Sequence, residues 1–123
     1  MVMPFREDLK TIYVDYIKPA VESKQLLIKR GDDFFSHHEI MTEIWSSIYH
    51  SKVVIGDLTG KNANVFYELG IAHSLGKPVL MLAQDISDVP FDVRGKRVII
   101  YEFTPKGLKE LQKQVRDALD AML

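Results

Sequence analysis

The feature that most constrains the fold is the stretch from Lys52 to Met81. It begins with an apolar run, continues through a polar loop into a helical pattern, and ends in a second apolar run after Gly76 and Pro78. This order of strand, loop, helix and strand is the unit that places two parallel strands side by side. In sheets of this kind, ligands sit at the carboxyl ends of the strands.

The remainder of the chain continues the same alternation. Apolar residues at helical spacing predict helices over residues 6–24, 38–51 and 64–75, and a last helix with Thr104 as N-cap and Pro105 at its first position. Pro19 predicts a kink or an early stop within the first helix. The predicted strands are short apolar runs bounded by turn residues, and they cover residues 2–5, 25–29, 52–57, 78–83 and 97–101.

We therefore predict one α/β domain over residues 1–123, with a flavodoxin-like three-layer sandwich. Its five-stranded parallel sheet has the order 2-1-3-4-5, because crossovers are right-handed and both faces of a parallel sheet need cover. A polar loop is predicted over residues 84–96. The ligand crevice is then expected between the first and third strands.

Composition excludes several classes of function. The net charge of -1 does not favour a nucleic acid polymer or an anionic membrane as partner. The chain has no cysteine, which excludes disulfides and thiolate metal sites, and we expect neither a metal nor a cofactor. No apolar run approaches the roughly 20 residues that span a bilayer, so we expect a cytoplasmic protein. The short first strand and an exposed sheet edge favour a homodimer.

Glu68 is the main candidate for chemistry. Asn64 and Glu68 are four residues apart and share a helix face, with Asn64 predicted as the N-cap. A carboxylate near a helix N-terminus is stabilised in its ionised form. Such a group facing a crevice can attack or stabilise a sugar carbon during N-glycosidic cleavage. The alternative is a solvated helix residue.

Other polar residues are expected around the same crevice. Asp57 either accepts a ribose hydroxyl or caps the following loop through Thr59 or Gly60. Asn62 and Asn64 lie in the loop and at the helix start, beside the crevice. The expected lining and ligand contacts are completed by three more residues, namely Phe5, which would stack on a base, Asp33, and Arg94, which would hold an anionic group.

Several motifs of the chain resemble those of nucleoside 2-deoxyribosyltransferase-like and TIR-like proteins of bacteria and archaea. The most specific is Asn-Val-Phe-Tyr-Glu-Leu-Gly at residues 64–70, followed by Gly76-Lys77-Pro78. This motif is part of a longer resembling block at residues 57–73, and shorter matches lie at residues 3–5, 17–20, 32–33 and 44–45, so the resemblance covers nearly the whole chain.

The resemblance implies that Glu68 is the residue that acts at C1 of a ribose-type sugar. It also implies a nucleoside, a nucleotide or NAD as the ligand, with deoxyribosyl transfer or N-glycoside hydrolysis as the reaction. Two alternatives remain open from the sequence, namely a non-catalytic sensor of a nucleotide signal and a self-assembling interaction domain.

Overall fold

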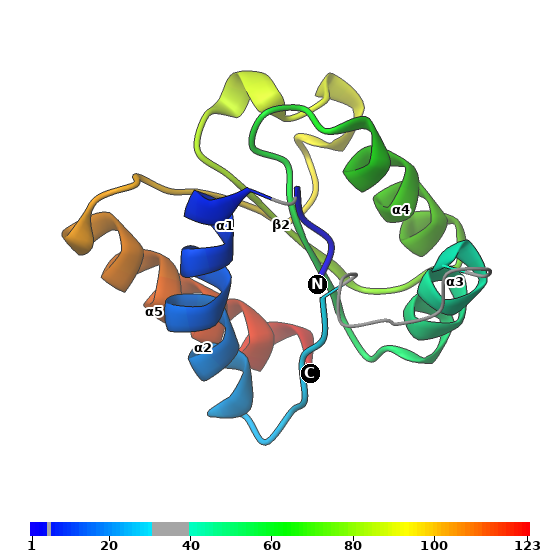
Figure 1. Cartoon of the computed structure of the whole chain (residues 1–123), viewed down its shortest axis with the longest axis horizontal. Helices are drawn as coiled ribbons and strands as arrows, with labels where there is room; N and C mark the ends of the chain where they lie inside the picture. Colours follow the sequence, from blue (N-terminus) through cyan, green and yellow to red (C-terminus); the bar gives the residue numbers. More distant parts are fainter. Residues whose placement is uncertain (5, 31–39) are drawn as a thin grey trace.

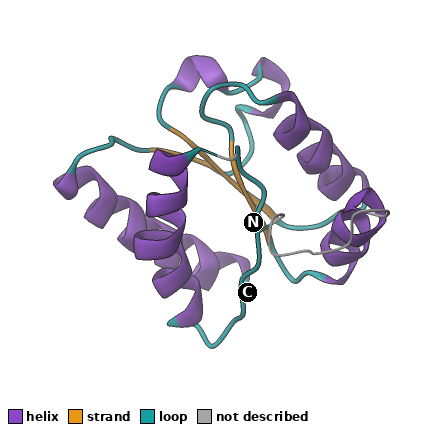
Figure 2. Cartoon of the chain, in the orientation of Figure 1, coloured by secondary structure: helices purple, strands orange, loops and turns teal. Residues whose placement is uncertain are grey.

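The computed structural model describes residues 1–4, 6–30 and 40–123. Within these residues the sheet has three strands, and both neighbouring pairs run parallel. Figure 2 shows the strands in orange, between two groups of helices. In spatial order the strands are β1 (Val54–Asp57), β2 (Val79–Ala83) and β3 (Val98–Ile100). The predicted α/β class with a parallel sheet is therefore confirmed.

Helices cover both faces of this sheet (Figure 1). One face carries α1 (Glu7–Ile12), η1 (Tyr13–Ile17), α2 (Lys18–Glu22) and α5 (Pro105–Met122), and the other carries α3 (Ile40–His50) and α4 (Ala63–Ser74). Alternate residues of β2 point to opposite faces, as the pleat of a strand requires. Leu80 and Leu82 join the apolar cluster on the α5 side, and Met81 and Ala83 join the cluster on the α4 side. The result is a layered sandwich with two apolar clusters.

The prediction of five strands is wrong for the described part of the chain. Only Val2 of the predicted first strand pairs with the sheet, in a single parallel bridge to Gly56. Pro4 has no backbone N–H, so this bridge cannot grow into a longer ladder through that residue. Residues 25–29 form no strand, although the Met1 amino group donates to the Lys29 carbonyl oxygen. The described spatial order is Val2, β1, β2, β3, which corresponds to the 1-3-4-5 part of the predicted order.

Pro19 does not end the first helix. The helix passes through the π-helical turn η1, in which the Lys18 N–H donates to the carbonyl oxygen of Tyr13, five residues earlier. A wider turn makes room for a proline ring that would otherwise clash with the carbonyl group four residues before it. The side chain of Gln112 on α5 supports this turn, because its Nε2 donates to the Tyr16 carbonyl oxygen at 3.1 Å.

The last helix, α5, follows the sequence prediction closely. Its N-cap is Thr104, whose Oγ1 accepts the backbone N–H of Gly107 at 2.9 Å, and Pro105 is its first residue. Its buried face includes Leu111, Val115 and Leu119. No helix in the described ranges is long and apolar enough to cross a membrane.

A close approach between β1 and α4 positions the candidate catalytic helix. A Cβ atom at Gly56 would lie only 2.6 Å from Cδ2 of Leu69, which is closer than two carbon atoms can pack. Glycine at this position therefore lets the Leu69 side chain lie directly on the strand. Glu68 is the neighbour of Leu69 on α4.

Candidate functional site

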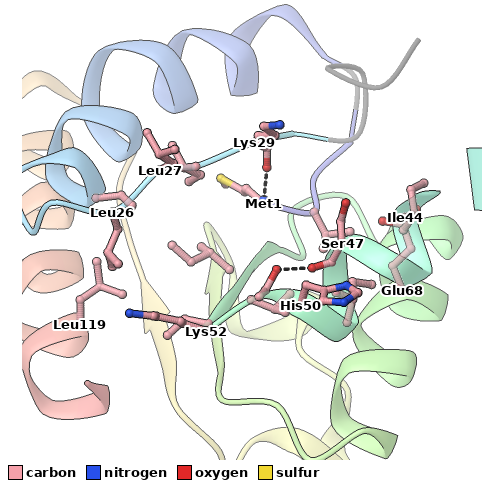
Figure 3. A pocket seen from close by; sticks show the side chains of 18 of the residues that line it. Met1, Leu26, Leu27, Lys29, Ile44, Ser47, His50, Lys52, Glu68 and Leu119 are labelled. Atoms are coloured by element: carbon pink, nitrogen blue, oxygen red, sulfur yellow. Dashed lines mark hydrogen bonds between the residues drawn. The ribbon is translucent and has the colours of Figure 1, made fainter. Parts of the chain in front are cut away.

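A pocket of about 550 Å³ lies beside the start of β1 (Figure 3). This volume falls in the range of small-molecule sites, roughly 300–1,000 Å³. Apolar side chains form most of its wall, including Leu26 from the extended segment after α2, Ile44 and Ile48 from α3, and Leu119 from α5. The polar and charged residues that line it are Gln25, Lys29, Ser47, His50, Ser51, Lys52 and Glu68.

Of the predicted site residues that the structure describes, Glu68 is the one that lines this pocket. It is half-buried on α4. Burial raises the pKa of its carboxyl group above the ordinary value, and the positive Met1 amino group partly opposes that rise. A carboxylate that is partly removed from water and faces a cavity is more basic than one in solvent, and such groups are typical of active sites.

At the carboxyl edge of the sheet, where the sequence predicts the crevice, four residues form a ring of hydrogen bonds. Asp57 Oδ1 accepts the Thr59 N–H at 2.9 Å, and Asp57 Oδ2 accepts the Tyr101 hydroxyl at 2.7 Å. Gln84 completes the ring, because its N–H donates to Thr59 Oγ1 at 3.2 Å and its Nε2 donates to the Tyr101 hydroxyl at 3.3 Å. Two of the strands thus continue directly into the ring, at Gln84 and Tyr101.

Asp57 is only 1% exposed. Burial raises the pKa of Asp57, while the hydrogen bonds from Thr59 and Tyr101 and the charge of Arg6 lower it. Burial beside this carboxylate also raises the pKa of Tyr101. The sequence allows two roles for Asp57. Its hydrogen bond with the Thr59 N–H is the loop-capping role. Asp57 does not line the pocket.

The N-cap of α4 is Asn62, and the prediction of Asn64 is wrong. Asn62 Oδ1 accepts the backbone N–H groups of Asn64 at 3.0 Å and of Val65 at 3.2 Å. The sequence offers an asparagine at both positions, and the left-handed conformation of Lys61 (φ 56°) directs the chain so that the first of them begins the helix. Asn64 is then an exposed residue of the first turn.

The other predicted site residues lie away from the pocket or outside the described residues. Arg94 donates to the carbonyl oxygens of Val89 at 3.1 Å and Ile86 at 3.4 Å, and so braces its own loop. Phe5 and Asp33 lie outside the described residues.

Several pocket residues were not singled out in the sequence, notably His50, Lys52 and Lys29. They come from the end of α3, the turn after it and the extended segment after α2. No local pattern marks them, because only packing brings these segments to one cavity. In the described part of the chain, no three histidine, aspartate or glutamate side chains gather closely enough to hold a metal ion.

Neither a protein-family model nor a curated protein matches the chain. Among solved structures, the chain is similar to the CMP N-glycosidase BcmB of Clostridium botulinum, with a TM-score of 0.68. The alignment covers 92% of this chain and 98% of that chain, at 20% sequence identity. At this identity the likeness shows a shared layered α/β fold.

Proposed function

We propose that the protein is an N-glycosidase that hydrolyses the bond between base and sugar in a nucleoside 5′-monophosphate. The observation that carries this proposal is Glu68, a half-buried carboxylate of raised pKa on the wall of a pocket large enough for a nucleotide. Fold likeness to an enzyme named as a CMP N-glycosidase supports the reaction class.

Glu68 would act at C1′ of the sugar. Its carboxylate either attacks this carbon as the bond to the base breaks or stabilises the positive charge that develops there. The electron pair of the broken bond leaves with the base. The oxygen of a water molecule then bonds to C1′, which releases the sugar phosphate and restores the carboxylate. One proton of this water stays on the new hydroxyl group, and the other balances the proton that the base nitrogen takes up.

The remaining charges of the pocket suit an anionic substrate. Three positive groups line the pocket, namely the ammonium groups of Lys29 and Lys52 and the amino group of Met1. Among the described residues that line it, Glu68 is the acidic one. A phosphate group is a good partner for lysine ammonium groups. A nucleotide could therefore place its phosphate near these cations while its sugar lies at Glu68.

The test is incubation of the purified protein with the common ribo- and deoxyribonucleoside 5′-monophosphates, the matching nucleosides, and NAD. Released base is measured by chromatography for the wild type and for Glu68→Gln. The matched control is Glu110→Gln, the same change at an exposed position of α5. We expect base release from one or more monophosphates, abolished in Glu68→Gln and unchanged in Glu110→Gln.

Other outcomes would point to other functions. Base release that survives in Glu68→Gln would contradict the role of this carboxylate. Incorporation of a second, labelled base into the nucleoside product would identify a transferase. Tight nucleotide binding by calorimetry without any base release would favour the sensor. The homodimer expected from the sequence stays a prediction, and sedimentation of the purified protein tests it.

A further inference from the structure

His50 is an exposed residue at the end of α3, and a contact with the backbone orients its ring. Its Nδ1 lies 2.8 Å from the carbonyl oxygen of Ser46. A carbonyl oxygen only accepts hydrogen bonds, so Nδ1 must carry a proton. The ring also makes an edge contact with Tyr49, with centroids 5.1 Å apart and planes at 78°. No hydrogen bond from a described residue engages Nε2.

The fixed Nδ1 proton determines what Nε2 can do. In the neutral ring Nε2 has a free lone pair and accepts a proton, and in the charged ring it donates one. A histidine oriented through Nδ1 by a carbonyl group is a common arrangement for a residue that moves protons at Nε2. The ring can therefore change its charge without losing the contact that holds it.

His50 and Glu68 line the same pocket from two helices that pack together, α3 and α4 (Figure 3). Cleavage of an N-glycosidic bond needs two groups, one for the charge at C1′ and one that supplies a proton to the departing base. Glu68 can serve as the first of these. His50 is the histidine of the described pocket, and an imidazole ring can both donate and accept a proton at one nitrogen.

We propose that His50 is the acid–base residue of this site, a role that rests on the proposed N-glycosidase function. As the bond from C1′ to the base nitrogen breaks, its electron pair stays on the base, and the Nε2 proton of charged His50 passes to the base. The neutral ring then takes a proton from the water that attacks C1′, while the Glu68 carboxylate leaves. The sum is addition of one water molecule, and His50 regains its charge.

Several charged groups line the same pocket as His50. Glu68 contributes a carboxylate from α4, Lys52 an ammonium group from the turn after α3, and Lys29 another from the extended segment. The amino group of Met1 lies on the same pocket. Lys77 is placed over the Tyr49 ring at 5.5 Å, behind the edge contact with His50. The pH profile must therefore be compared between variants that leave these groups unchanged.

The experiment compares two variants with the wild type. His50→Gln removes the imidazole, and His50→Asn also does so while keeping an N–H group near the position of Nδ1, where it can donate to Ser46. We expect both to lower kcat for base release by about 10²- to 10⁴-fold, the usual contribution of a general acid or base, with little change in KM. Both should also lose the basic limb of the kcat/KM profile.

His73→Gln is the matched control, because it makes the same change on α4 outside the pocket, and it should keep the wild-type rate and profile. An unchanged kcat and basic limb in His50→Gln would overturn the proposal. Full activity in His50→Asn would overturn it too, because the ring would then serve only to contact the helix. If Glu68→Gln is inactive while the His50 variants are active, the N-glycosidase function stands and His50 is rejected. A wild type that releases no base overturns both.

Discussion

At the scale of single residues, the chain uses two carboxylates in opposite ways. Asp57 is buried, and each of its carboxylate oxygens accepts a hydrogen bond from a protein donor. Glu68 is half-buried on the wall of a cavity, and the positive group that acts on it belongs to Met1. Environment, rather than residue type, therefore separates a structural carboxylate from a candidate catalytic one.

The raised pKa of Glu68 predicts a pH-dependent cost to stability. The folded protein holds this proton more tightly than the unfolded chain does, so stability falls as the pH rises from 4.5, the ordinary value, through the folded pKa. Glu68→Gln removes the charge. We expect it to raise the melting temperature at neutral pH, and to lose that advantage below pH 4.5. Glu110→Gln should show no such pH-dependent gain. A Glu68→Gln protein that is less stable than the wild type at neutral pH would contradict this.

Tyr101→Phe tests the hydrogen-bond ring at the carboxyl edge of the sheet. The change removes the hydroxyl that donates to Asp57 Oδ2 and leaves a buried carboxylate oxygen without that donor. We expect a loss of about 1–3 kcal/mol in the free energy of unfolding, measured with urea. Tyr49→Phe makes the same change on a ring that is 50% exposed, and should stay within about 0.5 kcal/mol of the wild type. If both changes have the same small effect, the hydrogen bond from Tyr101 to Asp57 adds no stability.

At the scale of elements, the close packing of α4 on β1 depends on Gly56, which has no side chain. Gly56→Ala places a methyl group against Leu69, and we expect it to cost roughly 1–3 kcal/mol as an overpacked contact. Leu69→Ala alone should cost about 2–5 kcal/mol through the cavity it leaves. The double variant should cost less than the sum, because alanine at position 69 makes room for the new methyl group. Urea denaturation of the wild type and the three variants measures the free energies of unfolding. Strictly additive losses would show that residues 56 and 69 do not contact each other.

The start of α4 offers a second test at this scale. Asn62→Ala removes the acceptor for two backbone N–H groups, and we expect it to destabilise the protein by about 1 kcal/mol. Asn64→Ala, two residues later and exposed, should change stability by less than about 0.5 kcal/mol. Thermal unfolding of both variants decides the point. A larger effect at Asn64 would restore it as the cap.

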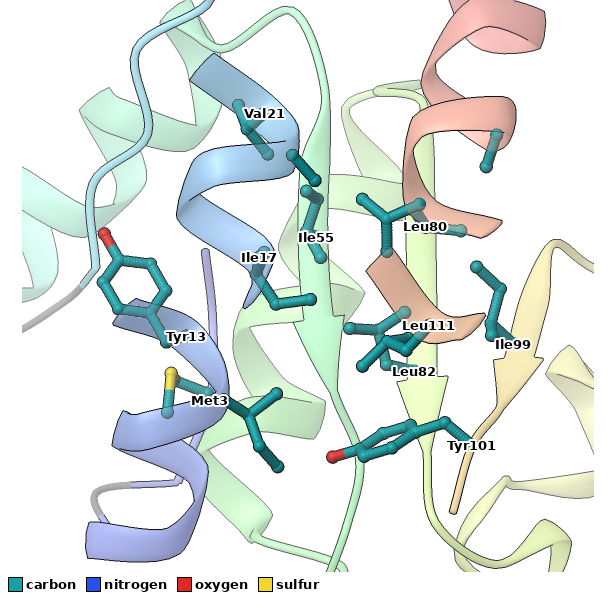
Figure 4. Packing of buried hydrophobic residues seen from close by; sticks show 14 of the residues in the cluster. Met3, Tyr13, Ile17, Val21, Ile55, Leu80, Leu82, Ile99, Tyr101 and Leu111 are labelled. Carbon is teal, nitrogen blue, oxygen red and sulfur yellow. The ribbon is translucent and has the colours of Figure 1, made fainter. Parts of the chain in front are cut away.

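At the scale of the whole molecule, β2 is the central strand and contributes side chains to both apolar clusters (Figure 4 shows the one on the α5 side). It pairs with β1 on one side and β3 on the other, and Leu80 and Leu82 are fully buried. Its amides should therefore exchange with solvent only when the whole domain unfolds.

Hydrogen exchange should distinguish the two sides of β3. The Tyr101 N–H donates to the Ala83 carbonyl oxygen, so the amides of Ile99 and Tyr101 point toward β2, and the amide of Ile100 between them points away. We expect slow exchange at Ile99 and Tyr101 and much faster exchange at Ile100, measured by NMR. Equal protection at all three positions would indicate that another segment or a second protein copy covers this edge.

Sequence patterns alone determined the alternation of strands and helices, the parallel sheet, the N-cap at Thr104 and the place of Glu68 on a helix. These features depend on apolar periodicity and on neighbours within one turn, which are readable from nearby residues. Tertiary structure decided which asparagine caps α4, how Pro19 is accommodated, how many strands the sheet has in the described residues, and where the pocket lies. It also paired Asp57 with Tyr101, 44 residues away. Such contacts depend on how separate elements pack, and no local pattern specifies that.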